Sequence, residues 1–133
     1  MQPKIDRLLA ETKTIAVVGL SGNPLRPSFG VSEYMQQAGY RIIPVNPAEE
    51  SILGEKSYRT LEEIPERVDC VDVFRKSEAV PEIVASAIQI GAKSIWLQEG
   101  VVHDEAAAVA EAAGLTVVQD RCILKEHRRW KRG

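Results

Sequence analysis

The chain has 133 residues and a net charge of −2, with 44% hydrophobic and 27% charged residues, which is typical of a single soluble globular domain over residues 1–133. No apolar run approaches the roughly 18 residues of a membrane span, and the charged N-terminal segment contains no apolar core of a secretion signal. Two cysteines do not make a disulfide framework, so we expect a cytoplasmic protein without a membrane partner.

Five short segments rich in valine and isoleucine recur along the chain and are predicted to be strands. They are residues 14–19, 40–45, 68–74, 93–98 and 115–119. Continuous apolar runs of this length are typical of strands that are covered on both faces, as in a parallel sheet.

Helical patterns separate these strands, and three helices are predicted over residues 31–38, 80–88 and 105–113. Each pattern is followed closely by a glycine, a common C-terminal stop. We expect Ser28 and Asp104 to cap the N-termini of the first and third of these helices. Thr60 and Glu63 match a capping box for a further, short helix.

Strands that alternate with helices through short loops indicate an α/β fold. The expected architecture is a Rossmann-like doubly wound sheet, mainly parallel, with right-handed crossovers that place helices on both faces. In such sheets, ligands bind outside the carboxyl ends of the strands. The candidate site therefore consists of the loops that follow the five strands.

The loop after the first strand reads VGLSGNPLRPSFG and has features of a phosphate-binding turn. Gly19 allows a close backbone approach, and Ser21 and Ser28 supply hydroxyls near the start of the next helix. Exposed amides and the helix dipole favour an anion there, beside the positive charge of Arg26. A rigid turn without a ligand explains the prolines but not the glycine followed by hydroxyls, so we favour phosphate.

The second strand ends at Asn46-Pro47, where an NAD site would have an acidic side chain for the ribose hydroxyls. Acids appear only later, at Glu49 and Glu50. Asn46 would hydrogen-bond an adenosine or simply start a turn. An NAD(H)-binding oxidoreductase or redox regulator is therefore the alternative function rather than the preferred one.

The third and fourth strand ends add charged and polar residues to the same edge of the predicted sheet. Arg75 and Lys76 follow the third strand, where two cations would either neutralise phosphates or remain solvated. The fourth strand ends in Gln98, Glu99 and Gly100, which suggests a tight backbone turn facing the same mouth.

Cysteines and histidines offer few catalytic or metal-binding patterns. Cys122 follows the fifth strand beside Arg121, and an adjacent cation favours the reactive thiolate, although simple packing has equal weight. Cys70 lies within a strand and is expected to be inert. His103 is expected at a helix start, and His127 has no evident partner. No metal-ligand spacing and no nucleophile elbow is present, so we assign no catalytic residue and no metal.

The last nine residues, KEHRRWKRG, hold five lysine or arginine residues against one glutamate, a formal charge of +4, and the rest of the chain therefore carries −6. A basic segment with a tryptophan is a candidate contact for nucleic acid. Because the rest of the chain is acidic, we expect a solvated, fraying terminus instead and no nucleic-acid partner.

Taken together, these segments resemble the small stand-alone CoA-binding proteins that are similar to the N-terminal domain of the succinyl-CoA synthetase α subunit. The resemblance extends roughly from Leu8 to Arg129 and rests on the segments VGLSGNPLRPSFGVS, PVNPAEESILGEKSY, VDVFRKSEAVPEIV, IWLQEGVV and DRCILKEHRR in this order. It implies a Rossmann-like fold that holds coenzyme A across the strand ends.

The resemblance also implies the residues that bind coenzyme A. Those implied for the phosphates are Gly19, Leu20, Ser21, Pro27 and Ser28, and those beside the nucleotide are Asn46 and Pro47. Those implied around the adenine and phosphates are Phe74, Arg75 and Val80, and those along the pantetheine path are Gln98, Glu99, Gly100 and Cys122. Ala48 stands where the family often has a lysine, a loss for which Arg26, Arg75 or Lys76 would compensate.

The phosphorylated histidine of the synthetase lies in a further domain, and neither His103 nor His127 matches it. The resemblance therefore implies binding rather than ligation. We expect a module that holds coenzyme A or a short acyl-CoA as a carrier, a sensor or a subunit, with another protein or a second copy of itself as partner. If the thiol of coenzyme A points towards Cys122, the two would form a mixed disulfide.

Overall fold

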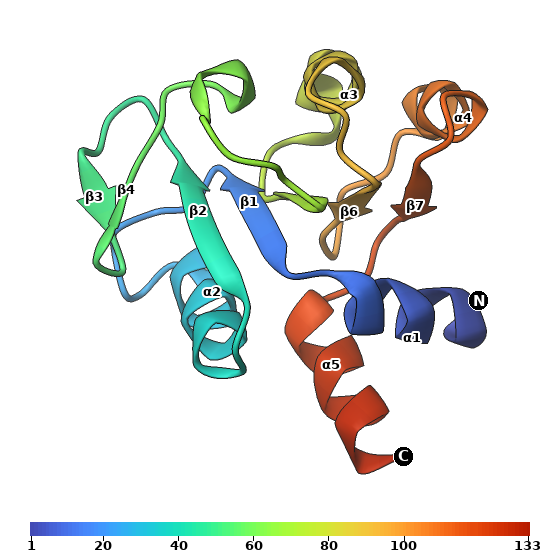
Figure 1. The fold of residues 1–133 in the computed structure, drawn as a ribbon, viewed down its shortest axis with the longest axis horizontal. Coiled ribbons are helices and arrows are strands. Elements are labelled where there is room, and N and C mark those ends of the chain that lie inside the picture. The colour runs from blue at the N-terminus through green and yellow to red at the C-terminus, as the bar shows by residue number, and fades with distance from the viewer.

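A computed structural model describes residues 1–133 and contains a central sheet of five parallel strands (Figure 1). The strands are β1 (Thr14–Val18), β2 (Arg41–Val45), β5 (Cys70–Val73), β6 (Ser94–Leu97) and β7 (Thr116–Val118). Their spatial order is β2-β1-β5-β6-β7, so the order of the chain reverses between β1 and β5. All five predicted strands and the Rossmann-like α/β fold are confirmed.

Helices cover both faces of the sheet, as predicted. One face carries α1 (Gln2–Glu11), α2 (Pro27–Gln37) and α5 (Ile123–Arg132), and the other carries α3 (Val80–Gln89) and α4 (Asp104–Ala112) (Figure 1). None of the helices combines the length and the apolar character needed to cross a membrane.

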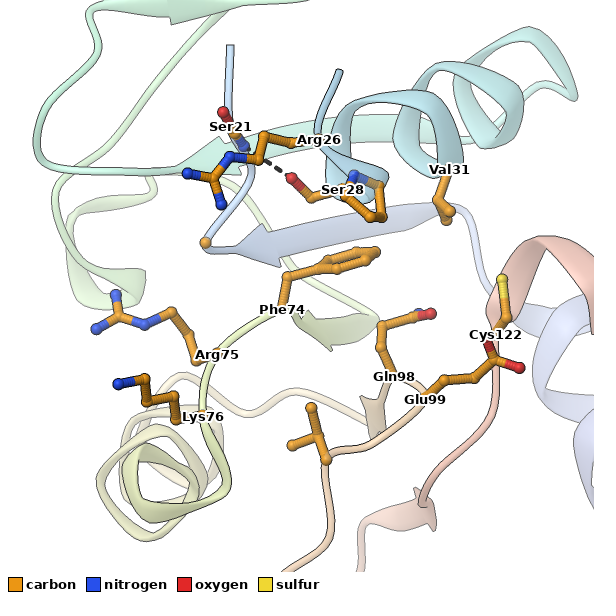
Figure 2. Close-up of a pocket in the computed structure, with 13 residues that line it drawn as sticks. Ser21, Arg26, Ser28, Val31, Phe74, Arg75, Lys76, Gln98, Glu99 and Cys122 are labelled. Atoms are coloured by element: carbon orange, nitrogen blue, oxygen red, sulfur yellow. Dashed lines mark hydrogen bonds between the residues drawn. The ribbon is translucent and has the colours of Figure 1, made fainter. Parts of the chain in front are cut away.

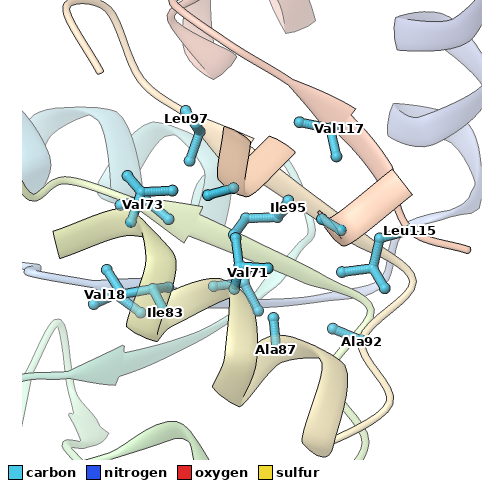
Figure 3. Close-up of a cluster of buried hydrophobic side chains, with 14 of the residues drawn as sticks. Val18, Val71, Val73, Ile83, Ala87, Ala92, Ile95, Leu97, Leu115 and Val117 are labelled. Carbon is cyan, nitrogen blue, oxygen red and sulfur yellow. The ribbon is translucent and has the colours of Figure 1, made fainter. Parts of the chain in front are cut away.

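Two apolar clusters fill the spaces between the sheet and its helices. Val71 and Val73 of β5 face α3 and α4, together with Ile95 of β6 (Figure 3). Cys70 and Trp96, from the same two strands, belong to the cluster under α1, α2 and α5. Because successive strand residues point to opposite faces and both faces are covered, the strands are mostly apolar at both sets of positions, with Asp72 of β5 as an exception.

The basic C-terminal segment is helix α5, so the prediction of a solvated, fraying terminus is wrong. Ile123 and His127 are buried on its inner face, while its positive charges lie mostly on the outer face. Arg129 forms an ion pair with Asp6 of α1, with 2.6 Å between Nη2 and Oδ1. Net charge does not reveal this docking, because it depends on Ile123, His127 and Trp130, which recur at helical spacing on the face of α5 that packs against the core.

Three short elements lie outside the main sheet. A hairpin of β3 (Ser51–Ile52) and β4 (Glu55–Lys56) was not predicted. Its turn residues Leu53 and Gly54 both have positive φ, but they lack the usual Asn-Gly or Asp-Gly signal. The 3-10 turns η1 (Leu61–Glu63) and η2 (Ser77–Ala79) precede β5 and α3.

The predicted N-caps are wrong. Helix α2 starts after Arg26, so Ser28 lies inside its first turn. His103 rather than Asp104 caps α4, because its Nδ1 accepts a hydrogen bond from the backbone N–H of Ala106 at 3.1 Å. Thr60 precedes η1, but its hydroxyl makes no capping hydrogen bond.

Candidate functional site

A cleft of about 600 Å³ opens at the carboxyl ends of the strands, where the order of the chain in the sheet reverses (Figure 2). Its size is within the usual range of small-molecule sites. Its walls come from the loops after β1, β5 and β6, from the first turns of α2 and from the start of α5. The lining residues are Gly19, Ser21, Arg26, Pro27, Ser28, Val31, Phe74, Arg75, Lys76, Gln98, Glu99, Val101 and Cys122.

Most of the residues proposed from the sequence lie in this cleft, and five do not. Leu20 and Val80 are fully buried in the apolar clusters, so their side chains serve the core. The other three that lie outside it are Asn46, Pro47 and Gly100.

Two valines line the cleft although they were not among the residues proposed from the sequence. Val31 follows Ser28 by three positions on α2, so helical spacing alone would place both on one face. Val101 directly follows the turn at Gly100.

Asn46 holds the end of β2 against the loop after β1. Its side-chain Nδ2 donates to the carbonyl of Leu20 at 2.8 Å, and its Oδ1 accepts from the backbone N–H of Ala48 at 2.8 Å. Both ends of the amide are therefore used inside the protein, where they shape the loop from behind the cleft.

Gly19 is required by the neighbouring chain segment. Its φ is +89°, and a Cβ at this position would overlap the carbonyl oxygen of Phe74 and lie 2.9 Å from Cδ of Arg75. The loops after β1 and β5 thus touch backbone to backbone, which only glycine permits here. This contact sets the distance between the two walls of the cleft.

The loop between β1 and α2 is held by its own polar side chains. The backbone N–H of Ser21 donates to Oγ of Ser28 at 3.0 Å, as Figure 2 shows. The N–H groups of Asn23 and Leu25 donate to the side chains of Ser21 and Asn23, each at 3.0 Å. Because the Ser28 hydroxyl accepts within the protein, its own hydrogen remains available to donate to a ligand.

Positive charge gathers at one end of the cleft. Arg26, Arg75 and Lys76 lie together there, and the sulfur of Cys122 lies at the other end beside Val31 (Figure 2). None of these three cations takes part in an ion pair within the protein. Unpaired cations at the mouth of a cleft favour an anionic ligand.

The end of the cleft opposite to the three cations contains a partly exposed cysteine at the start of a helix. Cys122 is the N-cap residue of α5. Its neighbour Arg121 is paired with Glu126, with 3.5 Å between Nη1 and Oε2, so this cation is already engaged. Cys70 is fully buried in the core, as expected, and burial raises the pKa of its thiol to about 12.

A buried carboxylate that the sequence reading missed lies beneath the floor of the cleft. Gln98 forms part of that floor, and its Nε2 donates to Oδ1 of Asp72 at 2.5 Å. Asp72 is 1% exposed, and burial raises its pKa to about 7. The signal available in the sequence was an acid at an inward position of an otherwise apolar strand.

Comparisons with known proteins agree on a single family. Residues 13–128 match the sequence profile of the CoA binding domain. The chain is 44% identical over 124 residues to the uncharacterized protein YneT of Bacillus subtilis (strain 168), which covers 93% of this chain and 92% of that protein. It is 32% identical over 101 residues to an acetate–CoA ligase [ADP-forming] II of Archaeoglobus fulgidus, covering 74% of this chain but 15% of the ligase.

A solved structure shows the same fold. The hypothetical protein from Pyrococcus horikoshii OT3 superposes with a TM-score of 0.95 and 38% identity, covering 98% of this chain and 92% of that one. The profile match and the similarity to these proteins both indicate the same family. The chain belongs to the CoA-binding domain family.

Proposed function

We propose that this protein binds coenzyme A, free or as a short acyl thioester, in the cleft at the carboxyl ends of its strands. Family membership supports the class of ligand. Coenzyme A carries its phosphates at one end and its thiol at the end of a long pantetheine arm. The observation that carries the proposal is the matching polarity of the cleft, with three unpaired cations at one end and Cys122 with Val31 at the other (Figure 2).

Each part of the ligand has a suitable counterpart in the cleft. Arg75, Lys76 and Arg26 would make charge-assisted hydrogen bonds to the phosphates, joined by the free hydroxyl hydrogen of Ser28. The ring of Phe74 lies between the two ends and would pack against the apolar part of the arm (Figure 2). The arm would then run towards Cys122.

The proposed role is to hold the ligand rather than to ligate it. No histidine lines the cleft, so the phosphohistidine step expected of a synthetase has no candidate residue there. The protein would act as a carrier, a sensor or a subunit, and a partner protein or a second copy would supply any reaction.

NAD is a poorer fit than coenzyme A. A dinucleotide site of this fold uses an acidic side chain after the second strand. Asn46 stands there, and both ends of its amide are bonded within the protein.

The test is calorimetric titration with coenzyme A, acetyl-CoA and NAD in parallel. Replacing Arg75 and Lys76 together by alanine should weaken coenzyme A binding by about 30-fold or more, because charge-assisted hydrogen bonds are lost. The matched control replaces Lys93 and Arg132, an exposed lysine and arginine outside the cleft, and should leave affinity nearly unchanged. Tight NAD binding without a response to coenzyme A, or equal effects of the two double variants, would refute the proposal.

A further inference from the structure

Asp72 is a buried acid without a cationic partner. It lies in the middle of β5, opposite Val17 of β1 and Trp96 of β6, on the face covered by α1, α2 and α5. It is 1% exposed and forms no ion pair with any lysine, arginine or histidine. Burying a carboxylate without a cation is unfavourable, and an apolar residue would pair equally well in the ladder.

A single side chain connects Asp72 to the cleft. Gln98, which is 4% exposed, donates from Nε2 to Oδ1 of Asp72 at 2.5 Å. Its Oε1 accepts from the backbone N–H of Ile123 at 3.4 Å. An ionised carboxylate only accepts hydrogen bonds, so Asp72 requires the NH₂ group of Gln98 to face it. The amide oxygen of Gln98 then faces the backbone N–H of Ile123.

This orientation matters because of where Ile123 lies. It is the first residue of α5, directly after Cys122, and its N–H is one of those that a helix start leaves without an intrahelical partner. The amide of Gln98 therefore ties the helix end that carries the thiol to the floor of the cleft. No other side chain accepts a hydrogen bond from the first turn of α5.

We propose that Asp72 is a positioning residue of the cleft: by orienting Gln98, it fixes the N-terminus of α5 and holds the Cys122 thiol where the thiol end of the ligand arrives. The inference rests on the proposed function for the identity of the ligand. It also explains why an unfavourable buried acid is present, since a preorganised site depends on a supporting layer of hydrogen bonds.

The inference is tested with Asp72→Asn and with the double variant Asp72→Leu/Gln98→Leu, which removes both polar partners together. The control is Asp69→Asn, near the start of the same strand segment, whose carboxylate accepts the backbone N–H groups of Lys13 and Thr14 at 2.9 and 3.1 Å. Three quantities are measured for each protein at pH 8, where the carboxyl group of Asp72 is ionised: the urea midpoint of unfolding, the affinity for coenzyme A, and the rate at which Cys122 reacts with an aromatic disulfide reagent.

We expect both Asp72 variants to keep or raise the urea midpoint, to bind coenzyme A at least fivefold more weakly, and to change the Cys122 rate at least threefold. Asp69→Asn should lower the midpoint and leave affinity and rate unchanged. Asp72 variants that bind and react like the wild type would overturn the inference. So would changes in affinity and rate that merely follow a loss of stability.

The two proposals fail in different ways. If the wild-type protein binds no coenzyme A, the proposed function fails. The Cys122 rate requires no ligand, so it still decides whether Asp72 positions the start of α5.

Discussion

The hydroxyl of Tyr34 and Nδ1 of His127 lie 2.8 Å apart, although 93 residues separate them in the chain. This contact joins α2 to α5 at the face of the sheet opposite to α3 and α4. Tyr40 and Trp130 also meet the imidazole edge to face, each with a centroid distance of 5.6 Å. Burial, reinforced by Lys131, lowers the pKa of His127, so the imidazole is held neutral within this aromatic cluster.

Removing the hydroxyl that bonds to His127 should weaken the docking of α5. Tyr34→Phe is expected to lower the free energy of unfolding by about 1 kcal/mol, because a partly buried imidazole nitrogen loses its partner. Urea denaturation measures the effect. Tyr58→Phe is the control, since the Tyr58 side chain is engaged through its ring, 5.3 Å from Nζ of Lys56, and an equal effect of both changes would contradict the prediction.

The buried acid predicts an unusual dependence of stability on pH. The pKa of Asp72 is raised from 3.8 to about 7 by burial, so between these values the folded protein holds a proton that the unfolded chain has lost. The contribution of this group is therefore fully present below pH 4 and is lost as the pH rises through 7. Asp72→Asn should raise the free energy of unfolding at pH 8 by a few kcal/mol, since each unit of pKa shift corresponds to about 1.4 kcal/mol.

Thermal unfolding of both proteins between pH 4 and 8 measures this difference. His127 contributes the opposite slope, because its lowered pKa means that stability is lost as the pH falls below about 6.5. The variant His127→Gln shows how much of the pH dependence of stability comes from His127. A difference between Asp72→Asn and the wild type that does not grow with pH would disprove the prediction.

Gly19 should not tolerate a side chain. Gly19→Ala places a Cβ against the carbonyl of Phe74 at a positive φ, so we expect a loss of about 1–3 kcal/mol in stability and weaker binding of coenzyme A. Gly30→Ala is a matched control, because Gly30 lies in α2 and its Cβ would meet nothing within 4 Å. That change should stabilise the protein by up to about 1 kcal/mol, and the reverse ranking of the two variants would be inconsistent with the structure.

Cys122 should exchange with the disulfide of coenzyme A. Its thiolate would attack one sulfur of the CoA disulfide, form a Cys122–CoA mixed disulfide and release one CoA thiolate. Mass spectrometry without reductant should show one CoA-sized adduct that a reducing agent removes and that is absent from Cys122→Ser. Cys70 is fully buried and should not react, so an adduct that persists in Cys122→Ser would exclude Cys122 as the site.

A carboxylate that is bonded to the loop after β1 should weaken the binding of coenzyme A. Glu49 accepts a hydrogen bond from the backbone N–H of Gly22 at 3.2 Å, which brings a negative charge to the loop after β1. Glu49→Gln is expected to raise the affinity for coenzyme A about two- to fivefold, and more at low salt, because the repulsion of the phosphates is reduced. Calorimetry at two salt concentrations tests this against the neighbouring change Glu50→Gln, and identical behaviour of the two variants would rule out a specific role for Glu49.

The sequence by itself determined the strands and the edge of the sheet at which the site lies. Residues 15–18 and 42–45 are continuous apolar runs because both faces of the sheet are covered, so these strands can be predicted from the local sequence alone. Parallel strands end at one edge, and this rule brings Ser28, Arg75 and Cys122 to a common cleft without knowledge of the strand order.

Only the tertiary structure decided which polar and apolar groups meet. Leu20 lies in a loop of the expected site yet packs in the core, and Asp72 lies in a core strand yet supports the floor of the cleft. His127 appeared solvated because its partner Tyr34 is distant in sequence. Local patterns record the period of a helix or strand, whereas burial and hydrogen-bond partners depend on segments that meet only after the chain has folded.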